Sequence, residues 1–375
     1  MKNFSKILCV VLALVMALSA AACSMSKQYA YKENDTELPI GVYIYYLRSA
    51  YSQAEGFAQK SDLYDSETGK YDGKDSFLKM EITDDDGNTA VAEQWIKDKA
   101  EKDTKLAIAT YLKAKELNAS TIDQTELDSV KSYYKSYWDQ SLSADYETYG
   151  VSFDSFMQIA YLIPVTESNA FKAQYAADGP TPVTDDELSK YFTDNYTSYK
   201  YFSVNLYETA TADEASSETS TESVPLSEDK IAAYQKEFDG YAKTLSSGGS
   251  YDDVIADYMK AHDITEDPTT SNVEVIDKET TDQLMKAILD MKDGQAMTIE
   301  IGETDTTKQL YLLYREPIAN QLKAYTDPEQ HRDDVLSSMK HEEFDELLEK
   351  YIEEKGVKLS SDCGKYNPSM FEAKK

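Results

Sequence analysis

Two strand-like stretches far apart in the chain limit the folds that this sequence can adopt. Residues 199–207 (YKYFSVNLY) and 308–315 (KQLYLLYR) are rich in aromatic, aliphatic and β-branched side chains, a pattern typical of strands. The helical and strand-like patterns between them cover residues 227–245, 251–260, 272–276 and 281–291. We therefore expect a module over residues 184–318 in which a small sheet joins segments that are distant in sequence.

Local signals mark the start and the turns of this module. Thr184 followed by Glu187 is the pattern of a capping box, so a short helix is expected to begin there. Gly248 and Gly249 separate the first two helical patterns, and Gly294 follows the last one. These signals agree with one succession of elements: a strand, two helices, a strand, a helix and a final strand.

With this order of elements the module resembles the parvulin family of peptidyl-prolyl isomerases. The resemblance is strongest to the extracytoplasmic members, the PrsA-type foldase lipoproteins and the SurA-like chaperones. The residues that carry it are Gly248, Gly249 and Tyr251 of a Gly-Gly-aromatic turn and Leu284, Ala287, Met291 and Gly294 of a helix end. It implies an α+β fold, in which a parvulin-like domain with a small antiparallel sheet is inserted into a mainly helical chaperone-like domain.

The positions that carry catalysis in the resembled enzymes have changed here. The two strand histidines of the family correspond to Ser203 and Tyr311, and the Met and Phe of its proline pocket correspond to Thr280 and Leu284. The resemblance therefore implies substrate binding near Thr280 and Leu284, with Ser203 and Tyr311 at the catalytic positions. We expect weak or absent isomerase activity on a retained fold. The alternative is an active isomerase that uses these nonstandard residues.

The N-terminus has the features of a secretory signal. Lys2 and Lys6 precede an apolar run that ends in three alanines before Cys23. Small residues directly before a cysteine resemble a bacterial lipoprotein signal, which implies a signal peptide over residues 1–22 and lipid on Cys23. The protein would then be anchored on the outer face of the cytoplasmic membrane. The alternatives are a cleaved signal with an incidental cysteine and an uncleaved anchor, and both also place the chain outside the cytoplasm.

The remainder of the chain is mostly helical in pattern. Apolar residues at helical spacing predict helices over 39–58, 91–117, 125–138, 153–176 and 326–354. The helix over 153–176 is expected to kink at Pro164, and the last helix is expected to end at Gly356.

The last helix needs a partner, because an amphipathic helix is not stable alone. In the resembled family it returns to the N-terminal helices, and we expect the same topology. The predicted segments are a tether over 23–38, a helical N-terminal domain over 39–183, the module over 184–318, a C-terminal helix over 319–359 and a tail over 360–375. Residues 208–223 are rich in Ser, Thr, Glu and Ala and have no large apolar side chain, so they are expected to form a disordered loop.

The charge of the chain excludes one class of partner. Asp and Glu number 69 against 38 Lys and Arg, which gives a formal net charge of −31. A field of this sign repels nucleic acid and anionic lipid headgroups, so nucleic acid is not expected as a partner. Only the lipid on Cys23 would hold the protein at a membrane.

Residues for cofactor or metal chemistry are few. The three histidines are His262, His331 and His341, and Cys363 stands alone once Cys9 and Cys23 are set aside. We expect His331 and His341 to face solvent. His262 is the only histidine in the module. It is either a surface residue or a contributor to the site, and the sequence leaves both alternatives open. No cofactor and no metal are expected.

The function that these observations favour is a chaperone or foldase that binds unfolded secreted polypeptides. The chain has 30 tyrosines, and tyrosine offers broad apolar area with a polar tip, which suits contact with varied chains. Many of them can equally be core residues of helices. A third possibility, a solute-binding lipoprotein, would need two α/β lobes, and the long helical stretch over 91–176 argues against it.

The lipid anchor can be tested by replacing one residue. Cys23→Ala should move the protein out of the membrane fraction or leave an unprocessed precursor, because two or more acyl chains bind a bilayer durably and one only marginally. Metabolic labelling with a fatty acid, followed by fractionation, measures the change. Labelling that is unchanged in Cys23→Ala would contradict the assignment.

Overall fold

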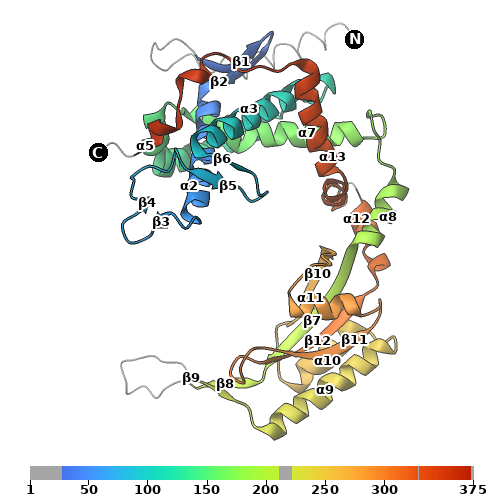
Figure 1. The fold of residues 1–375 in the computed structure, drawn as a ribbon. Coiled ribbons are helices and arrows are strands. Elements are labelled where there is room, and N and C mark those ends of the chain that lie inside the picture. The colour runs from blue at the N-terminus through green and yellow to red at the C-terminus, as the bar shows by residue number, and fades with distance from the viewer. Residues whose placement is uncertain (1–27, 211–221, 328, 373–375) are drawn as a thin grey trace. The chain divides into compact units, whose positions relative to one another are not determined.

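The computed structural model describes residues 28–210, 222–327 and 329–372. The predicted signal peptide and Cys23 lie outside these residues. The chain divides into two compact units, which Figure 1 shows as ribbons. Unit 1 combines the residues up to 183 with those from 340 onward, and unit 2 consists of residues 184–339. Within the described ranges, no helix has both the length and the apolar character of a membrane span.

Unit 1 is mainly helical. Its two long N-terminal helices, α2 (Ile40–Gln59) and α3 (Ala92–Glu116), pack against each other, and α13 (Arg332–Lys355) enters the unit at residue 340. The other helical elements are α4 (Gln124–Tyr137), η1 (Trp138–Leu142), α5 (Ser143–Tyr146), η2 (Glu147–Tyr149), α6 (Phe153–Met157), η3 (Gln158–Leu162), α7 (Ile163–Tyr175), η5 (Cys363–Lys365) and η6 (Pro368–Phe371).

Short antiparallel hairpins complete unit 1. They are β1 (Tyr29–Glu33) with β2 (Thr36–Pro39), β3 (Tyr64–Asp65) with β4 (Lys70–Tyr71), and β5 (Glu81–Thr83) with β6 (Thr89–Val91). The last one turns through Gly87, whose φ of +82° suits glycine, so the Asp-Gly sequence there is a turn.

The first hairpin corrects the expected tether over 23–38 for its described part, which begins at residue 28. Ala30 and Leu38 are fully buried in the core of unit 1, and the Ser360 amide donates to the Ala30 carbonyl at 2.8 Å. The polar residues that suggested a tether lie at the turn of the hairpin, while the few apolar ones alternate into the core.

The predicted irregularity at Pro164 takes the form of a π-helical segment, η3, directly before α7. Proline has no amide hydrogen to donate to the carbonyl four residues earlier, which is that of Ala160. The Tyr134 hydroxyl donates to this carbonyl instead, at 3.3 Å. A side chain from α4 therefore occupies the place of the missing backbone donor.

The C-terminal residues pack more tightly than a tail. Gly356 ends α13 with a φ of +62°, as expected, but α13 begins at Arg332 because α12 (Leu322–Thr326) and a turn precede it. Beyond Gly356, Cys363 and Phe371 are buried in the core of unit 1, so the expected tail over 360–375 is corrected for its described part. The Phe371 ring contacts Tyr51 with a centroid distance of 5.6 Å.

Unit 2 contains a four-stranded antiparallel sheet. Its strands are β7 (Tyr196–Asn205), β10 (Thr270–Val275), β11 (Ala296–Ile301) and β12 (Gln309–Glu316), in the order β10-β7-β12-β11. The strands predicted over 199–207, 272–276 and 308–315 are confirmed, whereas β11 was not expected. The helical elements of the unit are α8 (Asp185–Asn195), α9 (Glu228–Ser246), α10 (Tyr251–Ala261), α11 (Gln283–Asp290), η4 (Ile318–Asn320) and α12.

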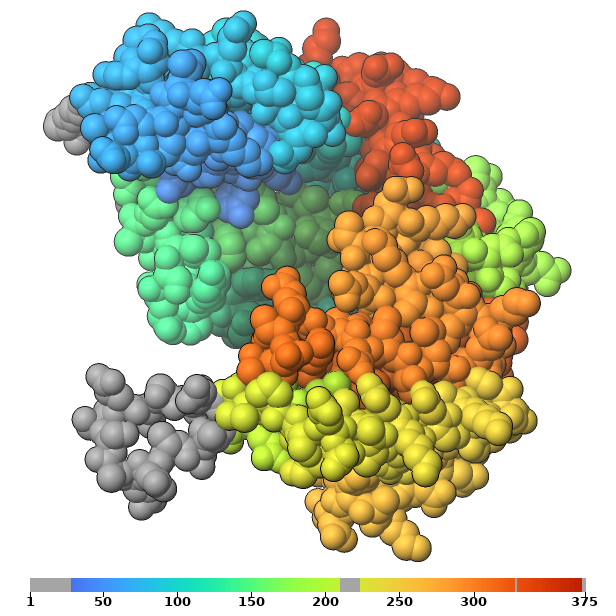
Figure 2. Space-filling view, turned by 60° about the horizontal axis from the view of Figure 1, so that its bottom comes forward, coloured from blue at the N-terminus to red at the C-terminus, as the bar shows by residue number. Residues whose placement is uncertain are grey.

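Helices cover both faces of the sheet. Phe202 and Leu312 are fully buried against α9 and α10 on one face, and Leu313 is fully buried against α11 on the other. Neighbouring residues of a strand point to opposite faces, so β7 and β12 serve both cores. The outer side of α9 is exposed and forms the yellow band across unit 2 in Figure 2.

The glycines between α9 and α10 have a physical reason. Gly248 has a φ of +90°, and a Cβ on Gly249 would lie 2.9 Å from the Thr244 carbonyl oxygen. This tight turn lets Tyr251 begin α10 as a buried residue stacked on Tyr314.

The loop expected over 208–223 is ordered at both ends. Strands β8 (Tyr207–Ala210) and β9 (Glu222–Pro225) pair as an antiparallel hairpin, which corrects the expected disorder for these residues. Backbone hydrogen bonds can pair two strands whatever their side chains, so a sequence without large apolar residues does not reveal such a pair. Residues 211–221 lie outside the described residues.

The packing of the C-terminal segment predicts a stability effect in unit 1. Phe371→Ala should lower the free energy of unfolding by about 3–5 kcal/mol, the usual cost of truncating a buried Phe. Both tryptophans of the chain, Trp95 and Trp138, belong to unit 1, so urea unfolding followed by their fluorescence reports on this unit.

Leu63→Ala is the matched control, because Leu63 is 51% exposed in the same unit and its loss should change stability by less than about 0.5 kcal/mol. Equal effects of the two substitutions would contradict the packing of the C-terminal segment.

Candidate functional site

A pocket of about 420 Å³ opens in unit 2 on the face of the sheet that carries α11. Its walls come from β7, β10, the segment before α11 and the first turn of α11. The lining residues are Tyr199, Tyr201, Glu274, Val275, Asp277, Thr280, Asp282, Leu284 and Met285. Thr280 and Leu284, the two predicted substrate-binding residues, are therefore brought together here.

Tyrosines of β7 form the aromatic wall. Tyr199 and Tyr201 point to the same face because they are two residues apart, and their rings stack with centroids 6.3 Å apart. The Tyr199 hydroxyl donates to Glu274 Oε1 at 2.8 Å and accepts from Asn272 Nδ2 at 2.9 Å. Burial raises the pKa of Tyr199 to about 12, so this hydroxyl stays protonated at neutral pH. The aromatic wall is thereby fixed in place.

The segment before α11 is shaped by short side-chain bonds to the backbone. Asp277 accepts from the amide of Glu279 at 2.9 Å, and Thr280 accepts from the amide of Asp282 at 3.3 Å. Asp282 is the N-cap of α11 and accepts from the Met285 amide at 2.7 Å. Thr280 thus serves as a turn residue at the rim of the pocket.

Arg315 holds the other end of α11. Its Nη1 donates to the carbonyls of Met291 at 2.7 Å and Leu289 at 3.1 Å, and its Nε lies 3.1 Å from Asp293 Oδ1. A cation at a helix C-terminus compensates the unpaired carbonyls there. Strand β12 therefore positions α11, and with it Leu284 and Met285, beside the aromatic wall.

One edge of the sheet borders the pocket. Among the described residues β10 pairs with β7 alone, so its outer edge keeps backbone groups without a strand partner. Val275, at the end of β10, lines the pocket and is 48% exposed. An extended peptide that pairs with such an edge places alternate side chains toward the neighbouring pocket.

The pocket is negatively charged. Its lining includes the carboxylates of Glu274, Asp277 and Asp282, and none of the lining residues is Lys or Arg. Apolar surface from Tyr201, Leu284 and Met285 lies between these carboxylates. The arrangement suits an extended ligand that combines an apolar side chain with positive charge.

The two residues at the catalytic positions of the resembled family, Ser203 and Tyr311, face each other across β7 and β12. Both are engaged with one acceptor, because the Tyr311 hydroxyl lies 2.6 Å and Ser203 Oγ 3.4 Å from Gln309 Oε1. They lie on the α11 face, and the Tyr311 ring is 5.8 Å from that of Tyr201, but neither lines the pocket.

The histidine of the module is separate from the pocket. His262 follows α10 on the opposite face, where its Nε2 lies 3.0 Å from both carboxylate oxygens of Glu237 and its ring stacks on Tyr234. It is neither a free surface residue nor part of this site. His331 and His341 are exposed, as expected.

The resemblance to a family indicates Thr280 and Leu284 but not the other residues that line the pocket. Tyr199, Tyr201 and Glu274 were not singled out, although the two-residue spacing of the tyrosines on a predicted strand places both on one face. Glu274 has no comparable signal, because its position depends on the register between β10 and β7.

Comparison with known proteins does not assign this chain to a family. No protein-family model and no curated protein sequence match this chain. Among solved structures, the chain is similar to the foldase protein PrsA from Streptococcus pneumoniae strain Canada MDR_19A, with 13% sequence identity and a TM-score of 0.35. The alignment covers 76% of this chain and 97% of that one. A likeness of this size assigns no function, so the residues of the pocket have to carry the conclusion.

The charge of the pocket predicts a preference that can be measured. The double variant Glu274→Gln, Asp277→Asn should bind a labelled peptide of alternating Lys and Leu roughly three- to tenfold more weakly, since exposed ion pairs contribute about 0.2–1 kcal/mol each. Both substitutions keep the acceptor oxygens that hold Tyr199 and the turn. Fluorescence anisotropy at low and high salt gives the affinities.

The double variant Glu266→Gln, Glu303→Gln removes two exposed carboxylates from unit 2 outside the pocket and serves as the control for net charge. If both variants lower the affinity equally, the general field of the protein and not the pocket sets the preference.

Proposed function

We propose that this protein is a lipid-anchored extracytoplasmic chaperone that binds unfolded polypeptides in the pocket of unit 2. In this proposal unit 2 is a degenerate parvulin-like domain inserted into the helical domain that the two terminal segments form. The observation that carries it is the pocket itself, in which an aromatic and aliphatic wall lies beside the free edge of β10.

A polypeptide fits this site better than a small polar solute. Main-chain pairing along β10 would bind any extended chain, and apolar contact with Tyr201 and Leu284 would favour segments with large side chains. Small-molecule sites gather several convergent polar groups that fix one orientation. Here Asp277, Thr280 and Asp282 are already occupied by backbone amides, which supports a site of low sequence specificity.

The polar residues next to the pocket support a role without catalysis. Rotation about a prolyl bond meets a barrier of about 18–20 kcal/mol, and lowering it requires groups held against the bound proline. Ser203 and Tyr311 both donate to Gln309 and do not line the pocket. We infer that binding was kept while the isomerase activity is weak or absent.

The solute-binding alternative has no support in the fold. It would need two α/β lobes, and the described part of unit 1 has only two-stranded hairpins beside its helices. In the proposed function the lipid on Cys23 holds the protein at the outer face of the cytoplasmic membrane, where secreted chains emerge unfolded.

Suppression of aggregation tests the binding function. The chain from Ser24 onward should slow the aggregation of a reduced, unfolded client, and Leu284→Asp should weaken this effect several-fold by placing a charge in the apolar wall. A carboxylate near the start of α11 is compatible with the helix dipole, so the fold should be retained. Light scattering measures the effect.

Val224→Asp is the matched control, because Val224 is 49% exposed in unit 2 and does not line the pocket. If Leu284→Asp suppresses aggregation as well as the wild type, the pocket is not the binding site.

An isomerisation assay separates the chaperone from the enzyme. With a proline tetrapeptide, the wild type should leave the uncatalysed relaxation of tens to hundreds of seconds unchanged. Substitution of Ser203→Ala and Tyr311→Phe should then change nothing further. Clear acceleration by the wild type that falls with either substitution would instead establish a divergent enzyme.

A further inference from the structure

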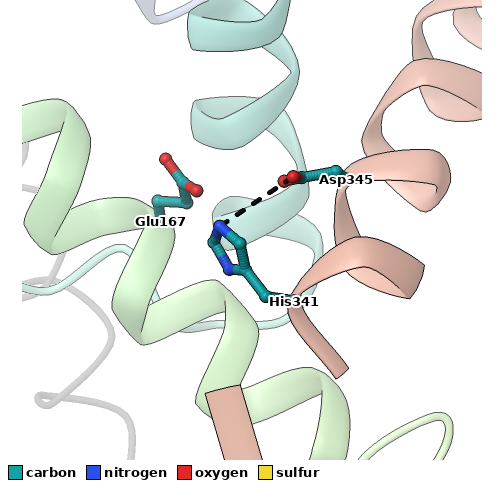
Figure 3. A group of neighbouring side chains, drawn as sticks. All are labelled: Glu167, His341 and Asp345. Carbon is teal, nitrogen blue, oxygen red and sulfur yellow. Dashed lines mark ion pairs between the residues drawn. The ribbon is translucent and has the colours of Figure 1, made fainter. Parts of the chain in front are cut away.

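Three side chains of the kinds that bind metal ions meet within unit 1 (Figure 3). Glu167 comes from α7, and His341 and Asp345 come from successive turns of α13. Their ligand atoms all lie within 4.8 Å of one another, and His341 Nε2 is 3.9 Å from Asp345 Oδ2. In Figure 3 the three side chains point toward a common centre.

Aromatic packing holds the two helices together beside this centre. Phe171, one helical turn after Glu167 on α7, meets the buried ring of Phe344 on α13 edge to face, with centroids 5.5 Å apart. The same Phe171 ring lies 6.2 Å from the ring of His341. The backbones that carry the three side chains are thus fixed by a core that does not depend on a metal.

The spacing is close to that of a metal site. Zinc binds imidazole nitrogen and carboxylate oxygen at about 2.1 Å, so two ligand atoms of a tetrahedral site lie roughly 3.4 Å apart. Atoms now within 4.8 Å of one another need to move by roughly an ångström, which side-chain rotation allows because His341 and Asp345 are exposed. Spacing of four residues on a helix already puts these two on the same face.

Glu167 lacks a partner for its charge. It is partly buried, and within the described residues it makes no hydrogen bond and no ion pair. Asp345 brings a second carboxylate close to it, and His341 is the one member of the group that is not acidic. A divalent cation would compensate both carboxylates while accepting the lone pair of the imidazole.

We propose that Glu167, His341 and Asp345 form a binding site for a divalent transition-metal ion, with Zn²⁺ as the reference ion. One nitrogen and two oxygen ligands match zinc, whereas Ca²⁺ and Mg²⁺ prefer sites made of oxygen alone. Water completes the coordination, since three protein ligands leave a position open. The site is independent of the pocket in unit 2 and of the proposed chaperone function.

Metal binding would connect two segments that are far apart in sequence. Glu167 precedes the chain's passage into unit 2, and His341 follows directly after its return at residue 340. A ligand that binds only the folded arrangement stabilises it in proportion to its occupancy. Zinc should therefore raise the melting temperature of unit 1.

The test is a titration of the tag-free chain from Ser24 onward with ZnCl₂, by calorimetry and by thermal unfolding followed through tryptophan fluorescence. We expect one site per chain and a zinc-dependent rise in melting temperature. His341→Ala and Glu167→Gln should each weaken binding at least about tenfold, and both should lose the rise in melting temperature.

Two controls separate this site from general attraction of cations by a chain with net charge −31. His331 pairs with Asp334 on an exposed helical turn at 3.1 Å but is not part of a three-residue group, so His331→Ala should bind zinc like the wild type. Excess CaCl₂ should not displace zinc. Equal loss in His331→Ala and His341→Ala, or displacement by calcium, would overturn the proposal.

Discussion

The antiparallel pairing of β7 with β12 is the interaction on which unit 2 depends. The two strands pair over eight positions, from Asn205 opposite Gln309 to Ser198 opposite Glu316. This pairing closes a loop that contains α9, α10, β10, α11 and β11. The chain therefore loses the entropy of the open loop before most of the contacts that offset this loss have formed. Once it forms, β10 and β11 can add at the edges and the helices can cover the two faces.

The two faces are covered to different extents. Two helices of 19 and 11 residues lie on one face, whereas α11 on the other has only 8 residues. Eight helical residues span about 12 Å, while the ten residues of β7 span about 33 Å. The short helix therefore covers only part of this face, and the pocket lies beside its first turn, with Tyr199 and Tyr201 of β7 in its wall.

Periodicity predicted most of the long elements and few of the short ones. The helices at 39–58 and 91–117 and the central strands follow from their apolar spacing, because that spacing is what their burial requires. The hairpins β1–β2 and β8–β9 and the strand β11 were missed. These strands have only four to six residues each, and so short a stretch does not give a periodic pattern that stands out from its surroundings.

The candidate sites likewise include residues that a local sequence pattern predicts and residues that it does not predict. Thr280 and Leu284, which were predicted to bind substrate, lie within one continuous segment and line the pocket, whereas substrate binding by them stays a prediction. The contribution of Glu274 depends on strand register, and the group of Glu167, His341 and Asp345 depends on the return of the chain to unit 1. The topology of the chain brings the residues of such groups together. Local sequence motifs therefore do not predict them, and no metal was expected from the sequence.

The acidity of the chain is consistent with the proposed location. A net charge of −31 repels an anionic membrane surface, and this repulsion acts within a Debye length of about 8 Å at physiological ionic strength. A protein held only by lipid on Cys23 would then stand away from the bilayer to which it is anchored. The same negative field attracts basic segments of unfolded chains. The carboxylates of Glu274 and Asp277 line the pocket, so the negative potential extends to it. Weak, screened attraction of this kind speeds encounter more than it strengthens binding, which is what a chaperone that must release its client requires.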